Sequence, residues 1–146
     1  MVKIVKGDLF KGEVDIIAHG CNTKNGFGSG VAGTIALQHP RAKIEYHAKF
    51  FKDGWELGDV QFVMSNSQTI ANCATQNEYY PRNKVHADYY SIRVAMEKVK
   101  AFAKAGNFSV GMPRIGCGLA GGDWSIVKDI LDEVFSDYDV TVFVQD

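Results

Sequence analysis

An apolar run that ends in a glycine-rich loop and then a helical segment is the feature that most constrains this fold. It spans residues 14–32, Val-Asp-Ile-Ile-Ala-His-Gly-Cys-Asn-Thr-Lys-Asn-Gly-Phe-Gly-Ser-Gly-Val-Ala. A strand that leads through glycines at 26, 28 and 30 into a helix is the outline of a phosphate-binding cradle. Glycines let backbone N–H groups approach an anion, and the helix N-terminus adds partial positive charge. His19 and Asn22 beside this loop indicate chemistry on a phosphorylated small molecule.

Strands and helices alternate along the rest of the chain. The expected strands are 2–5, 14–18, 60–64, 69–74, 108–112 and 140–144, and the expected helices are 30–38, 41–52, 86–104 and 124–135. This alternation predicts an α/β fold with a mostly parallel central sheet. The 146 residues fit one domain and contain no linker or repeat, so residues 1–146 are expected to form a single domain.

Three of the expected helices show an apolar face at helical spacing. The inward residues are expected to be Ile44, Ala48 and Phe51 in helix 41–52, then Tyr89, Ile92, Met96, Val99 and Ala103 in helix 86–104, and Ile126, Val127, Ile130, Leu131 and Val134 in helix 124–135.

A second glycine-rich loop, residues 115–122, follows strand 108–112. Ligands of open α/β sheets bind beyond the carboxyl ends of the strands. Because both glycine loops directly follow strands, we expect them to face one cleft.

Charge and cysteine content exclude several classes of protein. A net charge of −1, from 16 basic and 17 acidic residues, argues against a dedicated nucleic-acid binder. No apolar run approaches the roughly 20 residues of a membrane-spanning helix, and the N-terminus does not resemble a signal peptide, so we expect a cytoplasmic protein. Three cysteines without a Cys-x-x-Cys pair, and four histidines without metal-ligand spacing, predict neither disulfides nor a zinc site.

Two nucleotide-binding motifs are also disfavoured. Residues 28–33 match G-x-G-x-x-G, but the acidic residue that should end the next strand falls in the expected helix 41–52. A P-loop sequence does not occur. The chain is therefore expected to work without a cofactor.

Several candidate site residues have both a structural and a functional interpretation. His19 is either a core histidine bonded to a neighbour or a general acid or base at a strand tip. Asn22 either orients a sugar hydroxyl or closes an Asx turn. Asp8 is either a turn or helix cap or an acceptor for an exocyclic amine, and Asp123 is either a helix N-cap or a catalytic acid or base.

Phe27 and the cysteines are interpreted from their surroundings. A large apolar side chain is costly to expose in a glycine loop, so Phe27 is expected to gate or stack on a ligand. Cys21, Cys73 and Cys117 have no obvious base partner in the sequence and are expected to be small packing residues.

Together these segments resemble the macrodomain family. The resemblance is carried by Gly-Asp-Leu-Phe at 7–10, Ala-His-Gly-Cys-Asn at 18–22, Gly-Phe-Gly-Ser-Gly-Val-Ala at 26–32 and Met-Pro-Arg-Ile-Gly-Cys-Gly-Leu at 112–119, with Trp124. The last block is similar to the branch that contains terminal ADP-ribose protein glycohydrolases and fungal-type ADP-ribose-1″-phosphate phosphatases. The resemblance covers essentially the whole chain and implies a three-layer α/β/α fold that binds ADP-ribose at the strand ends.

The resemblance also implies roles for individual positions. Asp8 would take the adenine amine, Asn22 would lie near the distal ribose, and the two glycine loops would hold the pyrophosphate from opposite sides. The implied ligand-binding residues are Asp8, Leu9, Asn22, Gly26, Phe27, Gly28, Ser29, Gly30, Val31, Arg114, Ile115, Gly116, Cys117, Gly118 and Leu119.

Departures from the family pattern select among activities. The lysine and aspartate of the glutamyl-ADP-ribose hydrolases align with Gln76 and Ala120 here, whereas Lys84 and Asp123 are out of register. His19 matches the histidine of the phosphatase-type members. The resemblance therefore implies a metal-free hydrolase of ADP-ribose-1″-phosphate, with His19 and Asp123 as the catalytic candidates.

Two alternatives use the same pocket: a non-catalytic ADP-ribose reader, or an enzyme that removes ADP-ribose from modified protein or nucleic acid. In each case the expected partner is ADP-ribose or its 1″-phosphate, bound by a monomer.

Overall fold

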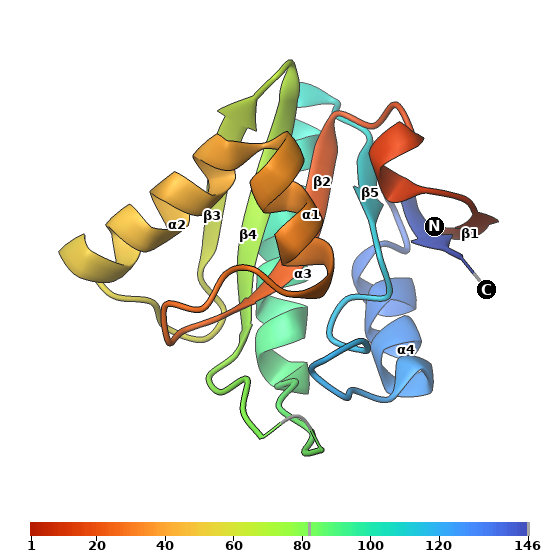
Figure 1. Ribbon diagram of the computed structural model, residues 1–146. Helices are drawn as coiled ribbons and strands as arrows, with labels where there is room; N and C mark the ends of the chain where they lie inside the picture. The colour runs from red at the N-terminus through yellow and green to blue at the C-terminus, as the bar shows by residue number, and fades with distance from the viewer. Residues whose placement is uncertain (82, 146) are drawn as a thin grey trace.

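The computed structural model describes residues 1–81 and 83–145 and contains one six-stranded sheet between two layers of helices (Figure 1). The strands are β1 (Val2–Lys6), β2 (Ile16–Asn22), β3 (Val60–Ser65), β4 (Gln68–Gln76), β5 (Val110–Met112) and β6 (Val140–Val144). Their order across the sheet is β1-β6-β5-β2-β4-β3. Only β3 runs antiparallel to its neighbour, β4, and every other pairing is parallel.

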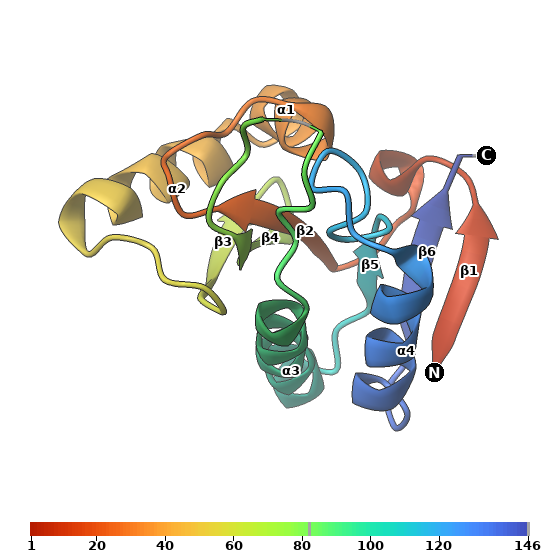
Figure 2. The ribbon, with the colours of Figure 1, turned by 90° about the horizontal axis from the view of Figure 1, so that it is seen from below.

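Helices cover both faces of the sheet (Figure 2). α1 (Gly30–Gln38) and α2 (Pro40–Lys52) lie on one face, and α3 (Tyr89–Gly106) and α4 (Trp124–Val134) lie on the other. A short 3-10 turn, η1 (Leu9–Lys11), follows β1. The predicted α/β/α architecture with a mostly parallel mixed sheet is therefore confirmed.

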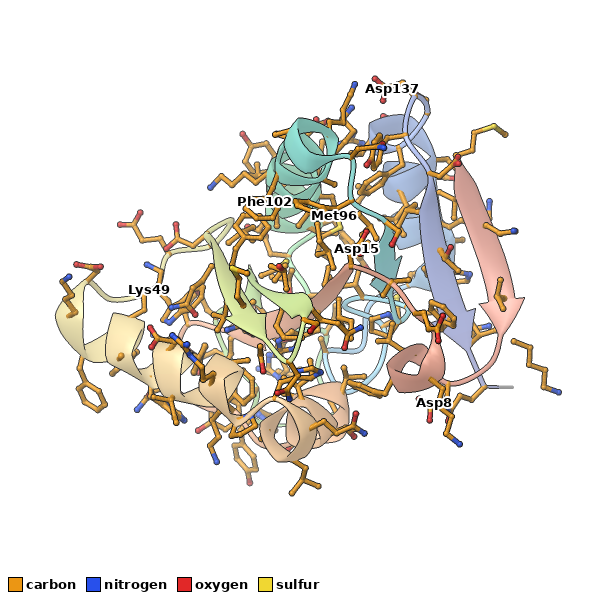
Figure 3. All side chains as sticks on the ribbon, turned by 90° about the horizontal axis from the view of Figure 1, so that it is seen from above. Asp8, Asp15, Lys49, Met96, Phe102 and Asp137 are labelled. Atoms are coloured by element: carbon orange, nitrogen blue, oxygen red, sulfur yellow. The ribbon has the colours of Figure 1, made fainter. Side chains whose placement is uncertain are left out.

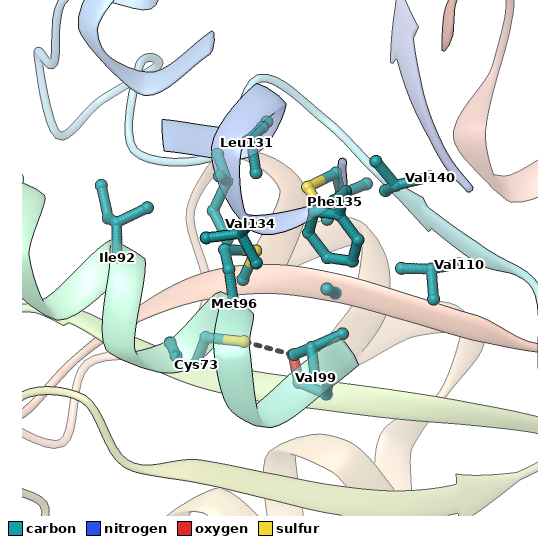
Figure 4. Packing of buried hydrophobic residues seen from close by; sticks show 14 of the residues in the cluster. Cys73, Ile92, Met96, Val99, Val110, Leu131, Val134, Phe135 and Val140 are labelled. Atoms are coloured by element: carbon teal, nitrogen blue, oxygen red, sulfur yellow. Dashed lines mark hydrogen bonds between the residues drawn. The ribbon is translucent and has the colours of Figure 1, made fainter. Parts of the chain in front are cut away.

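Each face of the sheet has its own hydrophobic core. The larger core joins the sheet to α3 and α4, and Figure 4 shows its centre, where Met96 and Val99 of α3 approach Leu131 and Val134 of α4. The smaller core joins the sheet to α1 and α2 and is built around Tyr46 and Trp55. Neighbouring residues of β2 alternate between the two, because successive side chains of a strand point to opposite faces: Ile16 faces the larger core and Ile17 the smaller.

The apolar faces of α3 and α4 are largely as predicted, but the predicted face of α2 is wrong. In α3 and α4 the expected inward residues are buried except for Tyr89, which is half-buried, and Ile126, which is 41% exposed. In α2, Ile44 and Phe51 are 62% and 76% exposed, and the buried residues are Ala42 and Tyr46. Tyr46 faces inward because its ring packs on Trp55, with centroids 5.1 Å apart, and its hydroxyl donates to the Asn22 carbonyl at 2.7 Å.

The predicted extents of two central strands are also too short. β2 continues to Asn22 and β4 to Gln76, although both contain polar residues in their middle. His19 of β2 pairs in register with Asn72 of β4, so it lies within the strand rather than at its tip. Within the described residues, no helix is long and apolar enough to cross a membrane.

Candidate functional site

A cleft of about 600 Å³ lies at the carboxyl edge of the sheet, between the two glycine loops. Because β2, β4, β5 and β6 are parallel, the segments that follow them meet at this edge. The cleft brings together most of the residues that the sequence singled out: His19, Asn22, Gly26, Phe27, Gly28, Ser29, Gly30, Val31, Arg114, Ile115, Gly116, Cys117, Gly118 and Leu119. The prediction that both loops face one cleft is confirmed.

Asp8 and Leu9 lie in a second hollow, of about 450 Å³, which adjoins the first. Figure 3 shows Asp8 beside the ends of β1 and β6. Both hollows are lined by Gly30, Val31, Pro113, Phe143 and Gln145, so they form one elongated site. Such a site suits a long ligand with a different chemical group at each end.

Asp8 also has the structural role that the sequence allowed. One of its carboxylate oxygens accepts a hydrogen bond from the Phe10 N–H at 2.9 Å and so caps η1. This bond fixes the position of the carboxylate at the second hollow.

The first glycine loop is held by Asn22. The side-chain oxygen of Asn22 accepts hydrogen bonds from the N–H groups of Lys24 and Gly26, at 2.9 and 3.0 Å, and its amide donates to the Gly26 carbonyl at 2.7 Å. This is the Asx-turn arrangement. Asn22 therefore shapes the loop, and its remaining surface, 8% exposed, faces the cleft.

The start of α1 gives the cleft an electropositive wall. Ser29 is the N-cap residue, and within the described residues its side chain makes no capping hydrogen bond. The first-turn N–H groups of a helix have no intrahelical partner, and the helix dipole adds partial positive charge there. Gly30, Val31 and Ala32 of this turn line the cleft, so their N–H groups are available to an anion.

The second glycine loop is folded on itself by backbone bonds. Gly116 has a positive φ of 76°, which favours glycine, and its carbonyl accepts from the Gly122 N–H at 2.8 Å. Beside this loop, the Arg114 guanidinium lies 5.8 Å from the centre of the Trp124 ring. Arg114 thereby contributes positive charge to the cleft wall.

His19 is fully buried beneath the cleft. Its Nε2 lies 2.6 Å from the Asn72 side-chain oxygen, and the Asn72 amide donates to the Ala42 carbonyl and to Gln61. The Phe27 and His19 rings pack edge to face, with centroids 5.5 Å apart. Burial lowers the pKa of His19 from 6.5 to about 4, so the ring is neutral at physiological pH and its Nε2–H donates to Asn72.

This geometry corrects the placement of His19 at a strand tip. The strand continues past this polar ring, because Asn72 on the neighbouring strand accepts its hydrogen bond. The burial of His19 and its bond to Asn72 fit the core interpretation, and its catalytic role stays a prediction.

Asp123, the other catalytic candidate, does not line either hollow. It is the N-cap of α4, and its carboxylate accepts hydrogen bonds from the N–H and hydroxyl of Ser125 at 2.9 and 2.7 Å. These bonds lower the pKa of the exposed carboxyl, so it stays ionised near neutral pH and is not poised to act as an acid.

Phe27 is an inward-facing residue of the loop. It is 7% exposed, and its ring lies 5.0 Å from the Tyr46 ring as well as against His19. It belongs to the smaller core and also lines the cleft, so it anchors the first glycine loop.

The titratable side chains of the described lining are few. They are His19, Cys21, Tyr79, Arg114 and Cys117; Asp, Glu and Lys are absent from the described lining of the larger hollow. Burial raises the pKa of Cys117 to about 11 and also raises that of Cys21, so both thiols are protonated at neutral pH. Among residues 1–81 and 83–145, no three His, Cys, Asp or Glu side chains are grouped to hold a metal ion.

The sequence interpretation missed part of the lining. Gln76 is the last residue of β4 and Tyr79 follows that strand, whereas Phe143, Val144 and Gln145 lie at the end of β6. The parallel arrangement of the sheet was a usable signal for Gln76 and Gln145, because parallel strands end at the same edge. Tyr79 lies in an irregular segment, and no spacing in the sequence indicates that it turns back to the cleft.

Known proteins resemble the chain along its full length. No sequence-family model matches it. It is 28% identical over 157 residues to the ADP-ribose 1″-phosphate phosphatase of Candida albicans, with 99% of each chain covered. It is also 28% identical over 154 residues to the ADP-ribose glycohydrolase OARD1 of Bos taurus, covering 98% of this chain and 90% of the relative.

Solved structures show the same fold. A protein of unknown function from Bacteroides thetaiotaomicron is 30% identical with a TM-score of 0.89, covering 98% of this chain and 97% of the other. The macrodomain protein of Streptomyces coelicolor is 29% identical with a TM-score of 0.83, and 99% of each chain is covered. Both glycine loops also line one cleft, as the sequence resemblance implied. These similarities show that the chain belongs to the macrodomain family.

Proposed function

We propose that the elongated site binds ADP-ribose. In this arrangement the adenine lies in the hollow beside Asp8, the pyrophosphate lies between the two glycine loops, and the distal ribose lies near Asn22 and Gln76. The observation that carries the proposal is that the first-turn N–H groups of α1 and the second glycine loop line one cleft that continues to Asp8. The names of the two relatives, an ADP-ribose 1″-phosphate phosphatase and an ADP-ribose glycohydrolase, support the same ligand.

The reaction that we propose is hydrolysis of ADP-ribose-1″-phosphate. Water attacks the phosphorus, the bond from phosphorus to the anomeric oxygen breaks, that oxygen takes up a proton, and ADP-ribose and inorganic phosphate leave. Backbone N–H groups of the loops stabilise the charge on the phosphoryl oxygens. Similarity to the Candida phosphatase supports this reaction. His19 then contributes by holding Phe27 and β2 in place, since its buried ring is bonded to Asn72.

A non-catalytic ADP-ribose reader is the second candidate. The observation that favours it is the absence of Asp, Glu and Lys from the described lining of the larger hollow, which leaves no exposed carboxylate or amine to act as a general base or acid. The same loops would bind the ligand, and no bond would break.

The test offers ADP-ribose, ADP-ribose-1″-phosphate and an ADP-ribosylated protein to the purified protein. Calorimetry measures binding, and phosphate and ADP-ribose release measure the two hydrolytic reactions. Release of phosphate is the expected result. Binding without release would establish the reader instead, and failure to bind ADP-ribose would overturn the proposal.

A matched pair of variants tests whether the first glycine loop holds the phosphates. A Cβ at Gly28 has no neighbour within 4 Å, so the position has room for a side chain to start, and Gly28→Glu and Gly28→Gln add side chains of equal size. We expect Gly28→Glu to weaken ADP-ribose binding at least tenfold more than Gly28→Gln, because like charges repel at short range. Equal affinities would place the phosphates elsewhere.

A further inference from the structure

The segment between β4 and α3 contributes Tyr79 to the lining of the cleft, and neither the motifs nor the resemblance gave this residue a role. Tyr79 lines the larger hollow but not the hollow of Asp8. Its ring lies beside Gly26, which also neighbours the Asn22 amide, and the proposed ligand has the distal ribose, which carries the terminal group, near Asn22.

The first half of this segment is fixed to the first glycine loop. The Thr23 hydroxyl donates to the Asn77 side-chain oxygen at 2.6 Å, and the Lys24 ammonium lies 3.8 Å from the Glu78 carboxylate. The Tyr79 ring packs directly on Gly26, because a Cβ at that glycine would stand 2.9 Å from the ring. These contacts fix where the Tyr79 ring stands.

The second half is fixed to the second glycine loop. The backbone N–H groups of His86 and Ala87 donate to the Ala120 carbonyl at 2.8 and 3.2 Å. Residues 77–79 thus contact the first glycine loop and residues 86–87 contact the second, and Figure 2 shows the described parts of this segment between β4 and α3. Tyr79 belongs to this segment, and its ring packs against the first glycine loop.

Tyr79 lines the cleft, and its hydroxyl is available as a hydrogen-bond donor. The side chain is 51% exposed, and among residues 1–81 and 83–145 its hydroxyl has no hydrogen-bond partner. No described carboxylate lines the larger hollow to repel an anion at this end. A phenol in this position suits a phosphate oxygen, since hydrogen bonds to charged acceptors are the stronger ones.

We propose that the Tyr79 hydroxyl donates a hydrogen bond to the terminal phosphate of ADP-ribose-1″-phosphate. Tyr79 is then a specificity-determining residue, which favours the phosphorylated ligand over ADP-ribose. This inference rests on the proposed function, since it requires ADP-ribose to lie in the cleft with its adenine beside Asp8.

The variant Tyr79→Phe removes the hydroxyl and keeps the ring on Gly26. We expect it to raise the Kd, or the KM if the ligand is hydrolysed, for ADP-ribose-1″-phosphate roughly tenfold, as for loss of a hydrogen bond to a charged group. The Kd for ADP-ribose should change less than about twofold, because ADP-ribose lacks the terminal phosphate. Tyr80→Phe is the matched control: Tyr80 is 77% exposed and does not line the cleft, so both constants should stay as in wild type.

Other results would overturn the inference in distinguishable ways. Equal weakening of both ligands would mean that the hydroxyl contacts a part that they share. No change for either ligand would mean that only the ring matters, as a wall of the cleft. If wild type binds neither ligand, the proposed function fails and the inference fails with it.

Discussion

His19 shows how neighbouring strands can accommodate a polar side chain in the middle of a sheet. Its Nε2–H donates to the Asn72 side-chain oxygen. The Asn72 amide donates to the Ala42 carbonyl of α2 and to the Gln61 side chain, and the Gln61 amide donates to the Glu45 carbonyl, also in α2. This network joins β2, β4, β3 and α2 with few unsatisfied polar atoms. His19→Ala leaves the Asn72 oxygen without its buried partner and opens a cavity.

We expect His19→Ala to lower the free energy of unfolding by about 2–4 kcal/mol. In the folded wild type, an NMR titration of the His19 ring should show no protonation until the pH approaches 4. The folded pKa lies below the unfolded value of 6.5, so this residue's contribution is complete above pH 6.5 and is lost as the pH falls toward 4. Urea unfolding at several pH values should therefore show a smaller decrease over this range in His19→Ala. A His19 resonance that titrates near 6.5 would contradict its burial.

At the scale of elements, α2 supports the binding cleft through Tyr46, and its His47 also lies 2.5 Å from the Asn25 side-chain oxygen of the first glycine loop. Tyr46 packs on Trp55 and Phe27, and its hydroxyl donates to the carbonyl and side-chain oxygen of Asn22 at 2.7 and 3.0 Å. Since Asn22 shapes the first glycine loop, α2 stabilises the loop without touching the cleft. Phe51, on the predicted but exposed face, makes no comparable contribution.

Tyr46→Phe and Phe51→Ala test which face of α2 is buried. Tyr46→Phe should lower the free energy of unfolding by about 1–3 kcal/mol, because buried acceptors lose their donor. Phe51→Ala should change it by less than about 0.5 kcal/mol, as for other exposed positions. Urea denaturation measures both. If Phe51→Ala lowered the free energy of unfolding by more than this, the buried face of α2 would be the one that the sequence predicted.

The elements themselves were largely predictable, because strands and helices alternate and their ends carry capping residues. Asp123 caps α4 as expected, and α3 ends at Asn107 in the left-handed conformation that favours such a stop. Polar pairs between elements were not predictable. His19 and Asn72 satisfy each other only after β2 and β4 are in register, and the burial of Tyr46 depends on Trp55 and on the Asn22 carbonyl, which come from distant parts of the chain.

The cleft, too, was predictable in part. Glycine loops after parallel strands predicted its place and most of its lining, since the carboxyl ends of such strands share one edge. Tyr79 and the position of Asp123 depended on the paths of irregular segments. Those paths are set by contacts between distant parts of the chain, such as Thr23 with Asn77 and His86 with Ala120.

At the scale of the whole molecule, one sheet serves two cores. Ile16 and Ala18 of β2 belong to the core of α3 and α4, whereas Ile17 and Cys21 belong to the core of α1 and α2. Separating either helical layer from the sheet would expose β2 on that face. The two layers should therefore unfold together, as small single domains usually do.

The two tryptophans of the chain allow this to be measured, because they lie on opposite sides of the sheet. Trp55 belongs to the core of α1 and α2, and Trp124 packs against the core of α3 and α4. In Trp124→Phe, fluorescence reports the first layer, and in Trp55→Phe it reports the second. Within each variant, the urea midpoint from fluorescence should coincide with the midpoint from far-UV circular dichroism. Because circular dichroism follows both layers at once, a fluorescence transition that precedes it would mean that one layer leaves the sheet first.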